Sequence, residues 1–235
     1  ILGSAVVEAL GRIRGTEYSI SDIAELTLRL EQEMRTGGGW EDQMGALVPG
    51  VKILRSRPGK VQKIGWTRLS PAAEKAFVRY LADHALLYFT GQKRMARNIL
   101  RKVLAFYAEN PHDFAKILVA SLKANAERCA EAMKCGNMRS FADAVNSYWR
   151  DKRLLDPGST NERVDAIVEA IAPWASAVTL CGAGGGGFMY ILAKSPADAG
   201  RIRRFLEANP PSPHSRFYTF DIDRRGMTVE CLPCV

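Results

Sequence analysis

The sequence has no long hydrophobic run, few histidines and no cluster of cysteines, and each absence argues against a class of function. No apolar stretch approaches the ~20 residues that span a bilayer, and no signal peptide is visible. We therefore expect a cytoplasmic protein with no membrane partner. Cys231 and Cys234 have Cys-x-x-Cys spacing, but no second pair or histidine cluster accompanies them. Zinc and redox functions are therefore not expected.

Clustered positive charge is also missing, although the net charge is +8. Lysine and arginine are spread along the chain, and no basic segment is interleaved with aromatic residues. A solvated basic surface explains this pattern as well as an anionic ligand does, and nucleic-acid binding is not predicted. With 235 residues, of which 47% are hydrophobic, the chain can bury a core and form one or two domains.

The first motif that points to chemistry is GGGWEDQ, residues 37–43. Three consecutive glycines let the backbone turn tightly and approach a ligand closely. A carboxylate fixed just beyond such a turn is a candidate general base, which directs attention to Asp42. An ordinary surface loop is the alternative. The apolar residues that follow, 47–54, are typical of a strand, as are residues 61–66.

A second carboxylate, Glu31, lies eleven residues before Asp42 on a predicted helix. That helix is expected to start at Ser21–Asp22 and to end at Thr36–Gly37. Glu31 borders its apolar stripe, and a partly buried carboxylate is costly unless it is paired or bound to a cation. An exposed helix charge is the alternative. The stripe consists of Ile23, Leu26, Leu30 and Met34.

A second glycine-rich motif, TLCGAGGGGFMYI, covers residues 179–191. Such a loop presents a concave set of backbone N–H groups, which suits phosphate oxygens or supports another loop that holds them. Flexible linkers have a similar composition. Linkers do not usually lie between apolar, strand-like segments, however, and here strands are predicted at 177–181 and 187–194. The loop itself consists of Gly182, Ala183, Gly184, Gly185, Gly186 and Gly187.

Together, TGGGWEDQMGALVPGVK and LCGAGGGGFMYILAK resemble the GHMP family of small-molecule kinases, and within it the L-fucose kinases. The segments YFTGQKRMARNIL (88–100) and SYWRDKRLLDPGS (147–159) also resemble fucokinase segments, so the resemblance covers essentially the whole chain. The segment RIRRFLEANPPSPHSRFYTF (201–220) resembles the kinase half of bacterial bifunctional enzymes that also make GDP-fucose.

The resemblance implies an ATP- and Mg²⁺-dependent sugar-1-kinase that converts L-fucose to L-fucose 1-phosphate. It implies that Asp42 is the base, that Glu31 is a Mg²⁺ ligand, and that residues 182–187 support the ATP phosphates. The turn containing Gly38, Gly39 and Trp40 would face the sugar. One residue departs from the family, because Glu41 stands where fucokinases usually have glutamine; its carboxylate either perturbs Asp42 or points to solvent.

The resemblance also implies an α+β fold, with residues 1–78 as the remainder of a first lobe and residues 79–235 as a ferredoxin-like C-terminal lobe. Ile1-Leu-Gly-Ser-Ala resembles the start of the helix that follows the family's phosphate-binding loop. We therefore expect that loop and a catalytic arginine upstream, in a longer and possibly bifunctional protein, and no kinase activity from residues 1–235 alone. Further strands are predicted at 81–90, 215–222 and 226–232.

Two other functions stay open. A GHMP kinase for a heptose phosphate or galactose would share the same chemistry. A non-catalytic binding or assembly module derived from a kinase lobe belongs to another class, and the retained Glu31 and Asp42 argue against it.

Overall fold

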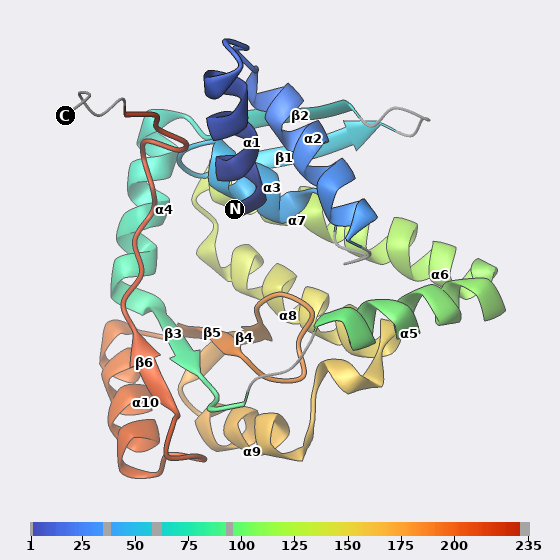
Figure 1. The fold of residues 1–235 in the computed structure, drawn as a ribbon. Helices are drawn as coiled ribbons and strands as arrows, with labels where there is room; N and C mark the ends of the chain where they lie inside the picture. The colour runs from blue at the N-terminus through green and yellow to red at the C-terminus, as the bar shows by residue number, and fades with distance from the viewer. Residues whose placement is uncertain (1, 35–38, 58–62, 93–95, 231–235) are drawn as a thin grey trace. The chain divides into compact units, whose positions relative to one another are not determined.

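The computed structural model describes residues 2–34, 39–57, 63–92 and 96–230 and shows an α+β fold (Figure 1). The chain divides into two compact units, residues 1–69 with 221–235 and residues 70–220. This division differs from the predicted one at 78/79, because helix α4 (Pro71–His84) packs on elements of the second unit. That the units correspond to two kinase lobes stays a prediction. None of the helices in the described ranges is long and apolar enough to cross a membrane.

In its described residues, the first unit contains three helices and two strands: α1 (Leu2–Ile13), α2 (Ile20–Glu33), α3 (Glu41–Leu47), β1 (Lys52–Arg57) and β2 (Lys63–Arg68). The two strands pair antiparallel, with Leu54 opposite Trp66. Helix α2 begins earlier than predicted, because Ser19 caps it: its Oγ accepts from the Asp22 N–H at 3.2 Å, and its own N–H donates to the Asp22 carboxylate at 3.0 Å. The core consists of Ile23, Ala24, Met44, Leu47 and Val48.

Helix α1 forms where the sequence indicates, but it buries an unexpected face. Its pattern of small and apolar residues suggests that Val6, Leu10 and Ile13 face the core, yet these three side chains are exposed. The buried residues are Ser4, Glu8 and Gly11. Small and polar residues form the buried face because α1 packs closely on α2, where the Thr27 hydroxyl donates a hydrogen bond to Ser4 Oγ at 3.2 Å.

Two strand predictions around the first unit are wrong. Residues 41–47 form helix α3 because Met44, Leu47 and Val48 follow helical spacing and all three are buried. The strand therefore starts at Lys52 rather than at residue 47. Residues 226–230 form no strand; the Met227 N–H instead donates to Leu47 O at 3.4 Å.

The second unit is built on a four-stranded antiparallel sheet in the order β4-β5-β3-β6. Its strands are β3 (Ala85–Phe89), β4 (Ala175–Leu180), β5 (Phe188–Ala193) and β6 (Arg216–Tyr218). With one helical connection between β3 and β4 and another between β5 and β6, this is the order of a ferredoxin-like sheet. Helix α4 extends to His84, past the predicted strand start at 81, and β6 is shorter than predicted.

Helices make up the rest of the second unit. The connection from β3 to β4 contains α5 (Ala96–Glu109), α6 (Pro111–Ala115), the π-helix η1 (Lys116–Lys123), α7 (Ala124–Cys135), α8 (Met138–Leu155), the 3₁₀ turn η2 (Pro157–Ser159) and α9 (Glu162–Ile171). Helix α10 (Pro196–Ala208) joins β5 to β6. Side chains of α8, α9 and α10 pack with the sheet in one core that includes Trp149, Ile171, Ile191 and Ile202.

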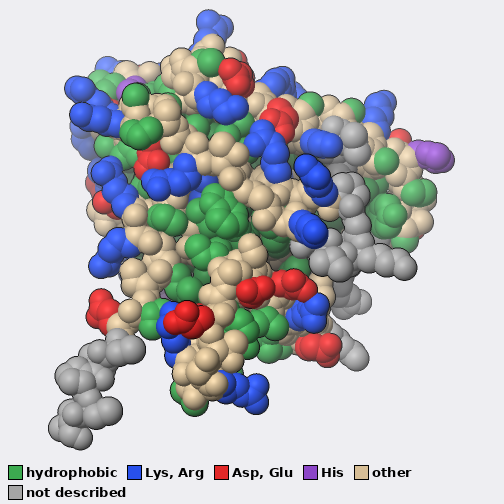
Figure 2. All heavy atoms as spheres, turned by 90° about the horizontal axis from the view of Figure 1, so that it is seen from above, with side chains coloured by type: hydrophobic (Ala, Val, Ile, Leu, Met, Phe, Trp, Pro, Cys, Tyr) green, Lys and Arg blue, Asp and Glu red, His purple; other side chains and the backbone are tan. Residues whose placement is uncertain are grey.

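Figure 2 shows how the charged side chains are arranged on one face of the molecule. In the view of Figure 2, lysine and arginine side chains are spread over the surface, with acidic side chains between them. This face shows no continuous basic patch of the kind that nucleic-acid-binding proteins present.

Candidate functional site

Asp42 lies in the first turn of α3 and is exposed. Its neighbour Gln43 is buried, at 2% exposure, and anchors the turn against the core. Within the described residues, Gln43 Oε1 is buried without a hydrogen-bond partner. The helix therefore holds Asp42 at the surface of its unit by burying the next two residues, Gln43 and Met44.

The other end of α3 is held by Lys52, the first residue of β1. Its Nζ donates to Gly45 O at 2.7 Å and also to Val48 O. These bonds occupy carbonyls that the end of a helix leaves without intrahelical partners. Burial lowers the pKa of Lys52, while the Asp223 carboxylate raises it. Sequence reasoning missed this lysine, because its spacing is that of an ordinary strand residue.

Glu31 lies in the last turn of α2 and is half-buried, as the predicted position beside the apolar stripe suggests. No group of three or more histidine, cysteine, aspartate or glutamate side chains in the described ranges could hold a metal ion. Mg²⁺ commonly takes only one or two protein carboxylates, with phosphate and water oxygens completing its shell. A single carboxylate such as Glu31 therefore fits that ion in donor type.

The turn between α2 and α3 is described only in part, and Gly38 lies outside the described residues. Trp40 is the N-cap residue of α3 and is half-buried, with its ring packed on the core of the first unit. Gly39 is exposed, and a Cβ there would lie 2.2 Å from Glu41 Oε2. The carboxylate of Glu41 therefore lies over the backbone of the turn.

The glycine loop, residues 182–187, joins the paired strands β4 and β5 and is an ordered turn. At Gly184, φ is +92°, and a Cβ would lie 2.6 Å from Ser159 O. At Gly186, φ is +147°, and a Cβ would lie 3.1 Å from Gln92 O. Neither position tolerates a larger residue without strain. The linker interpretation is therefore excluded by the geometry.

Hydrogen bonds from three segments fix the buried half of this loop. The Gly185 N–H donates to Ser159 O at 2.5 Å, and the Asn161 side chain donates to Gly185 O at 2.9 Å. The Gly187 N–H donates to Gln92 O at 2.8 Å. Because these bonds use the N–H groups of Gly185 and Gly187, only some of the backbone N–H groups in the predicted concave set are left to face a ligand.

The more exposed part of the loop, Gly182 and Ala183, is held together with the preceding Cys181 by Lys152 of α8. Its Nζ donates to Leu180 O at 2.8 Å and to Gly182 O at 2.5 Å. The side chain is buried, and burial lowers the pKa of Lys152 to about 8, with Cys181 acting in the opposite direction. The signal that could have found it is the position of a lysine three residues after the buried Trp149, on the core face of a helix.

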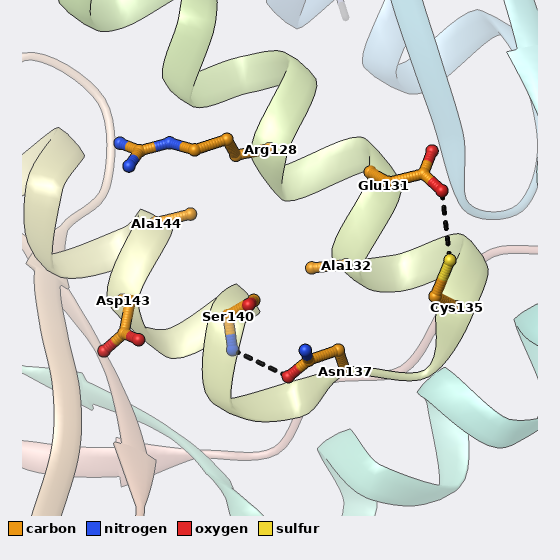
Figure 3. Close-up of a pocket in the computed structure, with 8 residues that line it drawn as sticks. All are labelled: Arg128, Glu131, Ala132, Cys135, Asn137, Ser140, Asp143 and Ala144. Atoms are coloured by element: carbon orange, nitrogen blue, oxygen red, sulfur yellow. Dashed lines mark hydrogen bonds between the residues drawn. The ribbon is translucent and has the colours of Figure 1, made fainter.

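A separate pocket of about 380 Å³ lies between α7 and α8 (Figure 3). Cys135 Sγ donates to Glu131 Oε1 at 3.0 Å, and Asn137 Oδ1 accepts from the Ser140 N–H at 3.0 Å as the N-cap of α8. The first bond lies within α7 and the second within the N-terminal cap of α8. None of the sequence-predicted site residues lines this pocket.

Comparison with known proteins defines the class. Residues 122–212 match the family model described as GHMP kinases C terminal. A mevalonate kinase from L. major superposes with a TM-score of 0.64, at 18% identity over 94% of this chain and 64% of that one. A Lactococcus lactis galactokinase superposes with a TM-score of 0.66, at 15% identity over 95% of this chain and 64% of that one. The chain therefore has a GHMP-kinase-like fold, and its residues 122–212 are similar to the C-terminal domain of GHMP kinases.

Two relatives in sequence carry names that include fucokinase. An L-fucokinase/L-fucose-1-P guanylyltransferase of Bacteroides fragilis is 34% identical over 97% of this chain, which covers 24% of that protein. A bifunctional fucokinase/GDP-fucose pyrophosphorylase of Arabidopsis thaliana is 38% identical over 88% of this chain, which covers 19% of that protein. The chain thus spans about a quarter or less of the length of these relatives. The resemblance drawn from the motifs is confirmed.

Proposed function

We propose that this chain is part of a longer, possibly bifunctional cytoplasmic protein, in which it contributes to an ATP- and Mg²⁺-dependent kinase that converts L-fucose to L-fucose 1-phosphate. The observation that carries the proposal is the ordered glycine loop between β4 and β5, in a chain that is similar to fucokinases over most of its length. The reaction is proposed for the full-length protein, because the chain spans only part of these relatives.

In this proposal Asp42 accepts the proton of the sugar's anomeric hydroxyl as its oxygen attacks the γ-phosphorus. A new O–P bond forms, the bond to the bridging oxygen of ADP breaks, and ADP leaves. Phosphoryl transfer depends mainly on positioning and on neutralising charge, which one fixed carboxylate and a set of N–H donors can supply. The exposed position of Asp42, on a helix anchored at both ends, suits this role.

Glu31 would hold Mg²⁺, which when bound supplies positive charge to the phosphate oxygens. Residues 182–187 would support the phosphates. Gly38, Gly39 and Trp40 would form the sugar-facing turn. Trp40 offers only part of its ring for this purpose, since the rest packs on the core.

The test is ADP release by the full-length protein with L-fucose, D-arabinose, D-galactose and a heptose phosphate as acceptors. We expect L-fucose to give the highest kcat/KM. Asp42→Asn should lower turnover about 100- to 10,000-fold, the usual contribution of a general base. Glu41→Gln is the matched control, because it changes the adjacent exposed carboxylate and should keep turnover within about threefold of the wild type.

Near-normal turnover of a folded Asp42→Asn protein would remove Asp42 as the base. Residues 1–235 alone, assayed in parallel, are expected to show no turnover, and measurable ATP-dependent phosphorylation would contradict that expectation. No turnover with any acceptor and no ATP binding would favour a binding or assembly module.

A second candidate substrate is supported by one observation. A D-glycero-alpha-D-manno-heptose 7-phosphate kinase of Campylobacter jejuni is 25% identical over 173 residues, or 72% of this chain. Preference for a heptose phosphate in the same panel would keep the proposed mechanism and replace the sugar.

A further inference from the structure

We propose that Lys152 is a positioning residue for the glycine loop: its ammonium group fixes the Gly182–Ala183 peptide so that the Ala183 N–H faces a nucleotide phosphate. The inference rests on the proposed kinase function for the identity of the ligand. The hold on the loop follows from contacts within the second unit alone.

The first step is the placement of the ammonium group. Lys152 is only 8% exposed, although it carries a charge. Its Nζ bridges Leu180 O and Gly182 O, the carbonyls on either side of Cys181. The ring centroids of Tyr148 and Trp149 lie 5.5 and 5.9 Å from the Lys152 Nζ. A buried charge in this setting is costly unless it is satisfied, so these two carbonyls are where its stabilisation comes from.

The second step is the direction that these bonds impose. A trans peptide is planar, and its C=O and N–H point in opposite directions. Because Gly182 O points at the buried ammonium group, the Ala183 N–H of the same peptide points away from it. No cis peptide bond interrupts the described chain. The Leu180 carbonyl is held in the same way, but the Cys181 N–H already donates to Phe188 O at 2.8 Å. Ala183 therefore supplies the donor that Lys152 orients.

The third step is to separate the buried part of the loop from the part that is accessible to a ligand. Residues 184–186 are buried, and Ser159, Asn161 and Gln92 hold Gly185 and Gly187 through hydrogen bonds. Gly182 is exposed and Ala183 is half-buried, so the donor accessible to an anion lies in the half that Lys152 holds. A Cβ at Gly184 would also lie 3.3 Å from Lys152 Cε, which shows how closely the lysine stem packs under the loop.

Lys194 offers a matched control. Its Nζ also bonds two backbone carbonyls, Ala172 O at 3.2 Å and Pro173 O at 2.7 Å, but it is exposed and lies beyond the other end of β5. Replacing either lysine with methionine removes the same charge and the same number of carbonyl contacts. A difference between the two variants therefore reports on the loop.

The experiment compares Lys152→Met, Lys152→Arg and Lys194→Met in the full-length protein. We expect Lys152→Met to raise the KM for ATP about 10- to 100-fold, the effect of losing a charge-assisted hydrogen bond, while kcat changes less than about threefold. Lys152→Arg, which keeps the charge and the donors, should recover most of that loss. Lys194→Met should leave the KM for ATP within about twofold of the wild type.

A second measurement does not depend on turnover. Amide hydrogen exchange without ligand should become at least about tenfold faster at Cys181 in Lys152→Met, because the Cys181 N–H is bonded to Phe188 O and belongs to the same peptide as Leu180 O; there should be little change there in Lys194→Met. Unchanged exchange, or a KM for ATP equal to that of Lys194→Met, would overturn the inference. Equal losses in kcat and stability that arginine does not recover would also overturn it, in favour of a purely structural lysine.

The two proposals fail differently. If the wild-type protein binds no ATP, the proposed function is wrong and so is the phosphate part of this inference. The exchange measurement would then still decide whether Lys152 holds the loop. If the wild type phosphorylates a sugar but Lys152→Met keeps its KM for ATP, only the role of Lys152 is wrong.

Discussion

Gly184→Ala provides the sharpest test of the loop geometry. At this position φ is +92°, a conformation that costs an L-residue about 1–2 kcal/mol. The new Cβ would also lie 2.6 Å from Ser159 O, a backbone atom that cannot swing aside as a side-chain end can. Moving that carbonyl would weaken its bond from the Gly185 N–H, at a cost of about 1 kcal/mol. The expected loss in free energy of unfolding is therefore about 2–3 kcal/mol.

Gly182→Ala is the control within the same loop. Its φ is +62°, but a Cβ there meets no atom within 4 Å, so only the backbone cost of about 1 kcal/mol applies. The two variants thus separate the clash from the conformational strain. The expected difference between them is about 1–2 kcal/mol.

The assay is equilibrium urea unfolding, followed by tryptophan fluorescence in a Trp40→Phe, Trp66→Phe background. The two tryptophans that remain, Trp149 and Trp174, both belong to the core of the second unit, so the signal reports on that unit. Equal free energies of unfolding for the two alanine variants, within about 0.5 kcal/mol, would refute the close approach of Gly184 to Ser159.

Two further predictions concern Lys52 and Lys152, the lysines that bond backbone carbonyls of the candidate site segments. Lys52→Met should lower the free energy of unfolding by about 1–3 kcal/mol, because it leaves carbonyls at the end of α3 without their donor. The control is Lys63→Met, which replaces an exposed lysine of the neighbouring strand. In the same urea titration it should change the free energy of unfolding by less than about 0.5 kcal/mol. Lys152 has a folded pKa of about 8, below its ordinary value of 10.5, so between these two pH values the unfolded chain binds more protons and the lysine's contribution to stability rises with pH. The difference in free energy of unfolding between the wild type and Lys152→Met should therefore rise above pH 8 by at most about 1.4 kcal/mol per pH unit, and a flat or falling difference would contradict the buried ammonium group.

The sequence predicts elements well where one signal dominates. The glycine loop between β4 and β5 is visible because six positions with five glycines interrupt two apolar segments, and no other local structure fits that pattern. The start of α2 at Ile20 lies next to the predicted Ser21–Asp22, because Asp22 in the first turn belongs to a local capping box, although its partner Ser19 was not predicted. Both signals are contained in a few consecutive residues.

Prediction fails where a tertiary contact decides between two local options. The run after Gln43 suits a strand or a helix, and it becomes α3 because Met44 and Leu47 reach the same core. The sequence of residues 226–230 suggests a closing strand. Just before this segment, however, Asp223 O accepts a hydrogen bond from the Gly50 N–H at 2.7 Å, and the segment therefore packs in the first unit. No local pattern contains either contact, because each partner is distant in sequence or on another element.

The same reasoning changes what the net charge of +8 means. Evenly spread lysines suggest solvated surface charge, but Lys52 and Lys152 each hold backbone carbonyls of a candidate site segment. A cation at the end of α3 stabilises the helix whose first turn carries Asp42, since it lies at the negative end of the helix dipole. The ammonium group under the glycine loop holds the Gly182 carbonyl inward and leaves the Ala183 N–H for an anion. In both segments a lysine bonds backbone carbonyls, and the proposed function assigns the phosphate and the sugar's proton to residues on the opposite side, Ala183 and Asp42.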